Sequence, residues 1–484
     1  MVFNSLTFIV FFIILLGLHY APFSWKVKKV NLLVASYIFY AAWNPVFILL
    51  LWLSTVVDFF VGRALYEQND PVKKKLLLVI SLIGNLGMLC FFKYGGFLLD
   101  NFVDLVNLIG WDFHPAKPNI ILPAGISFYT FTTLCYTIDM YRKESQPVKS
   151  LLDFSLFVTF FPHLVAGPIV RPPQLVPQFE NPKAATRSQF IDGLFLLSLG
   201  LFMKVVLADS FLAPTANDVF DSKESLLFLD AWMGVFAFSG QIFFDFAGYS
   251  TCAIGVAACL GFVLPQNFKY PYAAIGFSDF WKRWHITLSQ WLRDYLYIPL
   301  GGNKNGKMQT YINLMLTMLL GGLWHGANWT FVVWGGLHGI YLAVERFFKT
   351  HNHNHHALHE VQSDQLNTHQ FFSLNFLKAL GTFMLINITW VFFREQDFSG
   401  AWMMLQSMFG FSNEAKALIN AIDLSKVSII TFCMLITHWL FRNTNVLTEF
   451  KKWPWWFSGF IWAFLVCMIL LSQESTSSFI YFQF

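Results

Sequence analysis

Charged residues are scarce in this chain of 484 residues. Asp, Glu, Lys and Arg make up 12% of it, whereas 56% is hydrophobic and 19% is aromatic. A soluble domain carries about 25% charged residues, so the composition excludes an ordinary soluble fold and predicts a membrane protein. The net charge of +4 is small. No basic cluster is interleaved with polar recognition residues, so we expect no nucleic-acid partner.

Paired-cysteine motifs are missing as well. None of the six cysteines forms a Cys-x-x-Cys pair, and all lie in apolar runs. We therefore expect six free, buried thiols, and neither a disulfide framework nor a thiolate metal site. The N-terminal segment lacks a basic n-region and a small-residue cleavage site, which predicts a retained first transmembrane helix. The cysteines are Cys90, Cys135, Cys252, Cys259, Cys433 and Cys467.

Apolar runs fill most of the chain, from Val2–Leu18 to Trp455–Leu471. A full span needs about 20 residues. Several runs are shorter, so some must be re-entrant or packed against other helices. We predict an all-α, polytopic bundle of about 11 transmembrane helices plus re-entrant or interfacial helices, in a single domain over residues 1–484. Residues 349–370, which include the tract His351–His359, are expected to form a solvated, His-rich linker with no catalytic metal.

Basic residues follow every second apolar run, which predicts the orientation of the chain. Cytoplasmic loops carry an excess of Lys and Arg, so these loops should be cytoplasmic and the N-terminus should lie on the outer, periplasmic side. The residues are Lys26, Lys28 and Lys29 after the first run, Arg63 and Lys73–Lys75 after the third, and Arg142, Lys143 and Lys149 after the fifth.

His325 is the leading catalytic candidate. It lies in the apolar, glycine-rich segment Gly321-Gly-Leu-Trp-His-Gly-Ala-Asn-Trp329. An ionisable ring at membrane depth is costly and marks a functional site by default. Burial favours the neutral imidazole, which can act as a general base. The alternative interpretation is a core histidine with satisfied hydrogen bonds. Asn328, in the same segment, is expected to line the substrate path.

Two further histidines accompany His325. His338 lies thirteen residues later, which on an unbroken helix is about 220° away, so we expect a packing or supporting role. His285 follows Trp284 in the aromatic and basic stretch from Phe277 to Lys307, which predicts an interfacial or re-entrant segment. There it would orient a substrate or mark a tunnel entrance. The alternative is a histidine at headgroup level with no role.

Other polar residues interrupt the apolar runs. Arg283 and Arg293 are suited to the phosphates of an anionic donor, although positive-inside bias explains them equally well. Asp245 and Tyr249 form a polar island that is expected to line the substrate path, where it would orient a catalytic histidine or make a structural hydrogen bond. His163 lies in the break Pro162–Pro173, where four prolines forbid a regular helix. It is expected to line the same substrate path.

Two long motifs resemble the membrane-bound O-acyltransferase (MBOAT) family, in particular its bacterial branch of alginate O-acetyltransferase membrane subunits. They are Trp281-Lys-Arg-Trp-His-Ile-Thr-Leu-Ser-Gln-Trp-Leu-Arg-Asp-Tyr-Leu-Tyr-Ile-Pro-Leu-Gly-Gly-Asn303 and Leu319-Leu-Gly-Gly-Leu-Trp-His-Gly-Ala-Asn-Trp329. Shorter matches appear in the same order at Leu122–Tyr129, Phe161–Arg171, Phe244–Ser250 and Trp390–Arg394. Where the branch commonly has Gly-Tyr-Ser-Asp, this chain has Gly248-Tyr-Ser-Thr251, which leaves any role of position 251 open.

The resemblance implies a function. His325 matches the family's catalytic histidine, and His285 matches its second functional polar position. The bundle would enclose a tunnel from the cytoplasm to the outer face. The expected donor is acetyl-CoA with no bound cofactor, and the expected acceptor is a periplasmic acetyltransferase of the SGNH-hydrolase type that acetylates a cell-envelope polysaccharide. The alternatives are a lipid O-acyltransferase that uses longer acyl-CoA, and a His-gated transporter. The absence of an internal repeat argues mildly against the transporter.

Overall fold

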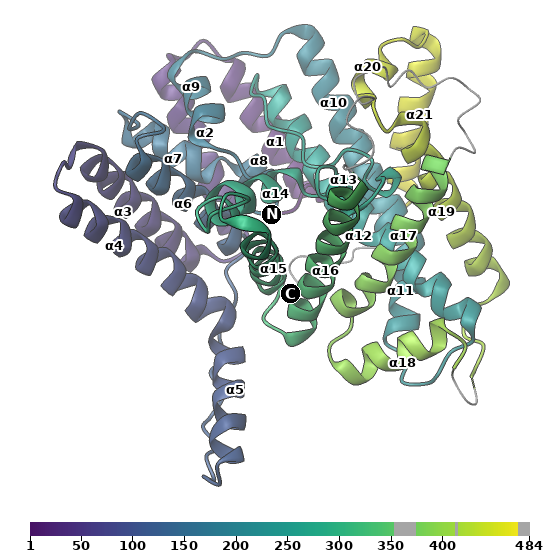
Figure 1. The fold of residues 1–484 in the computed structure, drawn as a ribbon. Helices are drawn as coiled ribbons and strands as arrows, with labels where there is room; N and C mark the ends of the chain where they lie inside the picture. The colour runs from purple at the N-terminus through teal and green to yellow at the C-terminus, as the bar shows by residue number, and fades with distance from the viewer. Residues whose placement is uncertain (353–373, 412–414, 473–484) are drawn as a thin grey trace. The chain divides into compact units, whose positions relative to one another are not determined.

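The computed structural model describes residues 1–352, 374–411 and 415–472. These residues form helices and no β-strand, apart from a single bridge between Leu226 and Lys416 (Figure 1). The prediction of an all-α fold is therefore confirmed. Most of the predicted His-rich linker lies outside the described residues.

Contacts between residues divide the chain into two compact units. The first unit comprises Met1–Leu201 and Tyr249–Pro265, and the second comprises Phe202–Gly248 and Gln266–Phe484. The boundary therefore falls within the long helix α12 (Phe228–Cys259).

The helices of the first unit begin at Leu6. Apart from the end of α12, they are α1 (Leu6–Tyr20), α2 (Trp25–Ala41), η1 (Pro45–Phe47), α3 (Ile48–Glu67), α4 (Pro71–Leu89), η2 (Cys90–Tyr94), α5 (Gly95–Leu108), α6 (Ile126–Arg142), α7 (Leu151–Thr159), α8 (Phe161–Leu164), α9 (Pro172–Glu180) and α10 (Arg187–Leu201).

The helices of the second unit include those that carry both long motifs. Besides most of α12 they are η3 (Phe202–Leu212), α11 (Ala213–Phe220), η4 (Pro271–Ala273), α13 (Phe277–Trp281), α14 (Ile286–Leu292), η5 (Arg293–Tyr297), α15 (Gly306–His325), α16 (Trp329–Asn352), α17 (Leu374–Arg394), α18 (Phe398–Met408), α19 (Ala421–Phe441), α20 (Val446–Phe450) and α21 (Trp455–Leu471).

Six helical stretches are long and apolar enough to cross a membrane, judged by length and composition over the described residues. This supports a multi-pass membrane protein, while the expected total of about 11 spans stays a prediction. The six are Pro45–Glu67, Pro71–Leu108, Arg187–Phe220, Phe228–Cys259, Leu374–Arg394 and Ala421–Phe441, and two shorter apolar helices are Leu6–Tyr20 and Trp455–Leu471.

A buried polar network fixes α4 between α3 and α6 in the first unit. Asp58 accepts hydrogen bonds from Ser81 Oγ at 2.6 Å and from Asn85 Nδ2 at 2.7 Å. Thr133 Oγ1 of α6 donates to Asn85 Oδ1 at 3.0 Å. Because buried polar groups are costly unless they are paired, this network specifies how the three helices pack.

The proline-rich break has the irregular backbone that its prolines predicted. α8 has only four residues, and the next helix begins at Pro172. Gly125, before α6, has a φ of 73°. A Cβ at this position would lie 2.8 Å from the Leu164 carbonyl oxygen at the end of α8. Both the left-handed backbone and the close approach require glycine here.

All six cysteines are free, as expected, but only three of them are buried. The prediction of six buried thiols is wrong for Cys90, Cys433 and Cys467, which are exposed. An apolar run in a membrane protein need not face other helices, because one side of it can face lipid tails. The hydrophobicity of the surrounding sequence therefore did not distinguish cysteines packed between helices from cysteines on the outer surface of the helices.

Candidate functional site

The hairpin of α15 and α16 brings His325 to the end of a helix. α15 ends at His325, Gly326 is extended with φ −156° and ψ 151°, and α16 begins at Trp329. Asn328 Oδ1 accepts a hydrogen bond from Thr330 N at 3.1 Å, as a side chain at a helix start commonly does. The break therefore lies inside the glycine-rich motif.

Two glycines allow the helices of this hairpin to pack closely. A Cβ on Gly322 would lie 2.3 Å from the Phe331 carbonyl oxygen, and a Cβ on Gly335 would lie 2.3 Å from the Met318 carbonyl oxygen. Real side chains never approach backbone atoms so closely, so any larger residue would force the helices apart. Small residues at such crossings are the usual device of membrane helix packing.

Aromatic rings enclose His325. The residue is 3% exposed. Its ring lies edge-on to Trp324 and Trp334, with centroids 5.0 Å away in both cases, and 5.4 Å from Phe393 of α17. An aromatic environment of this kind keeps bulk water away from the imidazole.

His338 shares an aromatic neighbour with His325. The ring of Trp334 lies 5.0 Å from His325 and 4.6 Å from His338. The expected separation of about 220° was conditional on an unbroken helix, and it does not apply because the helix breaks at Gly326–Asn328. His338 Nε2 lies 3.2 Å from Thr389 Oγ1, so this ring links α16 to α17.

His285 has an unusual backbone and a defined tautomer. It caps α14 with φ 41° and ψ 56°, a left-handed conformation that is costly for a residue other than glycine. Its Nδ1 lies 3.1 Å from Asn267 Oδ1, which also accepts from Thr287 N at 3.3 Å and Thr287 Oγ1 at 2.9 Å. Since a backbone N–H can only donate, this atom is the amide oxygen, and the neutral His285 ring carries its proton on Nδ1.

Burial also keeps His285 uncharged. It lies between the short helices α13 and α14, outside the candidate spans. Burial lowers its pKa to about 3, because removal from water disfavours the imidazolium form. At neutral pH the imidazole of His285 is therefore uncharged.

Trp324 joins the two candidate histidines. Its ring lies 5.0 Å from His325 and 6.1 Å from His285, edge-on in both cases. The second unit thus brings together two residues that lie forty positions apart in the sequence. Trp324 is itself buried, so a displacement of this indole would disturb both imidazoles.

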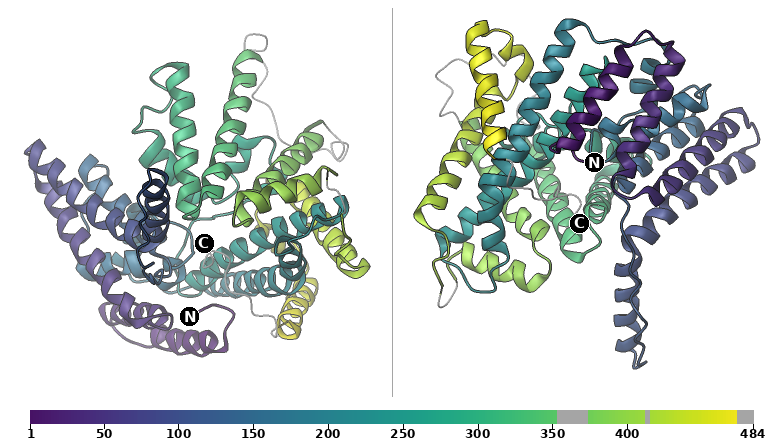
Figure 2. Two further views of the ribbon diagram at one scale, coloured as in Figure 1. Left: turned by 90° about the horizontal axis from the view of Figure 1, so that it is seen from below. Right: turned by 180° about the vertical axis from the view of Figure 1, so that it is seen from behind.

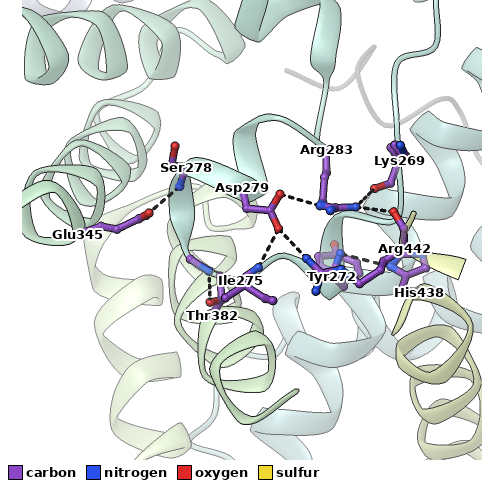
Figure 3. A network of polar contacts seen from close by, with 11 residues as sticks. Lys269, Tyr272, Ile275, Ser278, Asp279, Arg283, Glu345, Thr382, His438 and Arg442 are labelled. Atoms are coloured by element: carbon purple, nitrogen blue, oxygen red, sulfur yellow. Dashed lines mark hydrogen bonds and ion pairs between the residues drawn. The ribbon is translucent and has the colours of Figure 1, made fainter. Parts of the chain in front are cut away.

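Arg283 belongs to a polar network within the second unit (Figure 3). Its Nε donates to Asp279 Oδ1 at 2.8 Å, and its Nη1 donates to the carbonyl oxygens of Arg442 at 2.6 Å and Lys269 at 3.4 Å. Arg442 Nη2 donates to Asp279 Oδ2 at 3.3 Å. Arg283 therefore holds α13 against the end of α19.

Arg293 and Asn328 lie elsewhere in this unit. Arg293 Nε donates to Asp294 Oδ1 at 2.6 Å and Nη2 donates to Oδ2 at 3.1 Å, so its exposed guanidinium already has a carboxylate neighbour. Asn328 Nδ2 donates to the Gln396 carbonyl oxygen at 2.6 Å. Asn328 thus ties the helix break beside His325 to the segment that follows α17.

Asp245 has a cationic partner that the sequence analysis missed. Lys204 Nζ lies 2.7 Å from Asp245 Oδ1 and 2.8 Å from Asp209 Oδ1, and all three side chains are buried. A buried carboxylate at membrane depth normally has such a partner. Lys204 lies in an apolar run of the sequence, and a lysine in such a run could have indicated a buried ion pair.

Tyr249 and His163 belong to the first unit. The ring of Tyr249 lies 4.7 Å from Phe3. His163 is buried in α8, with its ring 6.2 Å from Phe160. Their predicted role in lining the substrate path stays a prediction.

Comparison with known proteins places these residues in context. The family model for membrane-bound O-acyltransferases matches residues 141–391, a segment that contains His285, His325 and His338. The chain is 39% identical to a Pseudomonas aeruginosa protein named "Probable alginate O-acetylase AlgI", over 90% of this chain and 80% of that protein.

Two other relatives carry different substrate names. The chain is 36% identical to a Helicobacter pylori peptidoglycan O-acetyltransferase, over 94% of this chain and 91% of that protein. A more distant match, 29% identical over 49% of this chain and 62% of the other, is a teichoic acid D-alanyltransferase of Bacillus subtilis. All three names describe acyl transfer to a polymer of the cell envelope.

Proposed function

This chain belongs to the membrane-bound O-acyltransferase family, and from that premise we propose that it moves acetyl groups from cytoplasmic acetyl-CoA across the membrane for O-acetylation of a cell-envelope polysaccharide. Alginate and peptidoglycan are the leading acceptor polymers, since two relatives carry these names. The chain would lie in the bacterial cytoplasmic membrane with its N-terminus in the periplasm, and a periplasmic acetyltransferase of the SGNH-hydrolase type would complete the transfer.

The observation that carries this proposal is that the imidazole rings of His285 and His325 both pack against the indole of Trp324. His325 and His285 are both buried, and each ring lies against the same indole. Acyl transfer from a thioester needs a base for the attacking group and a site from which water is excluded. In this proposal the imidazole of His325 is the base. The rings of Trp324, Trp334 and Phe393 that enclose it support the exclusion of water.

In the proposed reaction, His325 takes the proton from an attacking hydroxyl group. The hydroxyl oxygen forms a bond to the thioester carbonyl carbon, the carbon–sulfur bond breaks, and the sulfur leaves as the CoA thiolate. The imidazolium of His325 then returns its proton to that thiolate. The products are the acetyl ester and CoA, and His325 is restored to its neutral form.

His285 acts as a positioning group in this scheme. With Nδ1–H directed at Asn267, its Nε2 accepts a hydrogen bond from the donor or the acceptor. It orients a reacting group and leaves proton abstraction to His325, the residue that matches the family's catalytic histidine.

The decisive test compares ester-linked acetate in purified envelope polysaccharides from cells that make the wild-type chain or His325→Ala at equal membrane abundance. Loss of a general base lowers a rate by about 10²–10⁴, so acetate should disappear from one polymer and thereby name the acceptor. Release of thiol from acetyl-CoA by the purified chain, assayed with a small alcohol added as the attacking hydroxyl group, should fall in parallel. A preference for palmitoyl-CoA over acetyl-CoA would instead favour lipid acylation.

His438→Ala is the matched control. His438 is also buried in the second unit, but its Nδ1 accepts a hydrogen bond from Tyr272 N at 3.2 Å. Its ring packs against Phe243, Tyr270 and Tyr272, which are not the rings that enclose His325. This variant should lose some stability and keep its transfer rate per folded molecule. Unchanged acetate in every polymer of the His325→Ala cells, with the protein folded in the membrane, would contradict the proposal.

A further inference from the structure

The longest apolar helical stretch is too long for one membrane crossing. It runs through α4, η2 and α5 from Pro71 to Leu108, which is 38 residues. At 1.5 Å per residue it measures about 57 Å, whereas the hydrocarbon core is about 30 Å thick. The π-helical turn η2, Cys90–Tyr94, separates the two halves, and such turns commonly mark a bend.

The first half of this stretch is held by other helices of its unit. α4 is fixed to α3 and α6 by the buried network around Asp58 and Asn85. α5 leads away from those helices (Figures 1 and 2) and packs against the chain that follows it. We call α5 together with residues 109–123 the arm.

The arm is an ordered structure rather than a free helix. Phe113 N donates to Asn107 Oδ1 at 3.0 Å, and Lys117 Nζ lies 2.7 Å from Asp100 Oδ1. The rings of Phe102 and Phe113 meet edge-on at 6.1 Å. These contacts hold residues 109–123 along one side of α5 and leave another side open.

An apolar stripe of exposed side chains runs along α5, and Phe102, whose ring also meets Phe113, lies at its margin. Leu98, Phe102, Leu105 and Ile109 are 51%, 53%, 58% and 65% exposed. Their spacing of four, three and four residues places all four within about 60° of the helix circumference. Outside the membrane, a contiguous exposed apolar patch of this kind usually marks a binding surface.

Basic residues indicate on which side of the membrane the arm lies. Lys73, Lys74 and Lys75 are at the start of α4, and Arg142 and Lys143 are at the end of α6. Positive-inside bias puts both ends in the cytoplasm. The segment between these two helices, which is the arm, then lies on the outer side.

We propose that the apolar stripe of the arm docks the periplasmic protein that receives the acetyl group, through an apolar patch on that protein bordered by basic side chains. This rests on the function proposed above. The arm carries Asp100, Asp104 and Asp112 against Lys117 alone, a net charge of −2 with His114 neutral, and complementary charge favours encounter with a basic partner.

The same charge disfavours the membrane surface as the occupant. Helices that lie on a bilayer have polar faces rich in Lys and Arg, and anionic lipids repel an acidic segment. α5 contains two aspartates and no basic residue. Its amphipathic pattern therefore fits a protein partner.

The first experiment uses the full chain with Phe102→Asp and Leu105→Asp together. Both side chains are exposed, so the protein should reach the membrane in normal amounts. Ester-linked acetate in the envelope polymer should fall at least tenfold, while thiol release from acetyl-CoA by the purified chain stays within twofold of wild type. Leu108→Asp is the matched control, because Leu108 is exposed on the same helix but lies about 120° from Phe102, and it should change neither readout.

The outcomes separate the two proposals. Unchanged polymer acetate in the double variant, or an equal loss in Leu108→Asp, would overturn the docking proposal. Absence of thiol release in the wild type would count against the proposed function and would not bear on docking, which the second experiment measures directly.

The second experiment places the photoreactive residue p-benzoylphenylalanine at position 105 in living cells. We expect one adduct with a soluble periplasmic protein, and Phe102→Asp should abolish it. The adduct protein, expressed and purified, should bind the wild-type chain in nanodiscs at least tenfold more tightly than the double variant. An adduct at twice the mass of this chain would identify a second copy, and an adduct with lipid alone would identify the membrane surface, and either result would overturn the proposal.

Discussion

At the scale of single residues, Asn267 has the most specific predicted effect. Its Oδ1 accepts from the His285 ring and from Thr287 N and Oγ1. Asn267→Leu leaves these buried donors unpaired, at a cost of about 1–3 kcal/mol, which corresponds to a loss of about 5- to 150-fold in rate if it is expressed at the transition state.

Steady-state kinetics of thiol release checks this prediction. A positioning role for His285 predicts that kcat falls and that Asn267→Asp, which keeps an acceptor oxygen, restores much of it. A loss of stability with unchanged kcat per folded molecule would show that Asn267 is structural only.

Glu395 gives the fold a dependence on pH. Burial raises the pKa of this carboxyl from its ordinary value of 4.5 to about 7; Asp397 and Asp221 add to the shift, and Arg394 opposes it. Between pH 4.5 and 7 the folded chain keeps a proton that the unfolded chain has lost. The stabilisation present at low pH is therefore lost as the pH rises through 7.

Thermal unfolding between pH 5 and 8 tests this sign. The wild-type Tm should fall as the pH rises, because the free energy of unfolding falls by on the order of 1 kcal/mol once solvent screening of this half-buried group is allowed for. Glu395→Gln should flatten the profile over the same range. A wild-type Tm that rises with pH relative to Glu395→Gln would contradict the assignment.

At the scale of elements, the α15–α16 hairpin should depend on its glycines. Gly322→Ala or Gly335→Ala puts a methyl group 2.3 Å from a backbone oxygen, so the helices must separate. Overpacking of this kind costs about 1–3 kcal/mol. Because His325 ends α15, we expect thiol release to fall more than tenfold.

Gly381→Ala in α17 is the control for this pair. A Cβ at Gly381 meets nothing within 4 Å, and alanine is favoured over glycine inside a helix by roughly 0.5–1 kcal/mol. This variant should keep full activity and gain a little stability. Equal behaviour of all three variants would show that close packing of the hairpin does not matter for catalysis.

In the same hairpin, some features of the site could be predicted from the sequence and others could not. The glycine-rich motif singled out His325, because an ionisable residue in an apolar run is conspicuous, and the aromatic and basic block Trp281–Asn303 singled out His285. The contacts of His338 with the same cluster were not predicted, because periodicity assumes a continuous helix and Gly326–Asn328 interrupts it. Asn267 was missed because a lone amide in an irregular segment carries no pattern, although its hydrogen bonds decide a tautomer.

At the scale of the whole molecule, the resemblance to the membrane-bound O-acyltransferase family is confirmed by matches over most of the chain. The all-helical class is confirmed as well. The number of spans was harder to predict than the class, since several helices are too short or too polar to be assigned as crossings from length and hydropathy. Helices such as α13 and α14 are set by tertiary packing, which a sliding window does not detect.

The predicted orientation can be tested with single cysteines in a chain whose six native cysteines are replaced. All six are free, so their replacement breaks no disulfide. A membrane-impermeant maleimide should label Trp111→Cys in intact cells and should label Lys149→Cys only after the cytoplasmic membrane is permeabilised. The reverse pattern would place the arm in the cytoplasm and invert the predicted orientation.

The indoles around His325 also make the site visible to optical measurement. Trp324, Trp334 and Trp390 are buried within a few ångströms of one another or of the imidazoles, and the emission of an indole depends on the polarity of its surroundings and on nearby quenchers. A thioester that enters this cluster replaces part of that environment. The donor-dependent change in the intrinsic fluorescence of the chain therefore offers a label-free titration of donor binding, and Trp324→Phe should reduce that change.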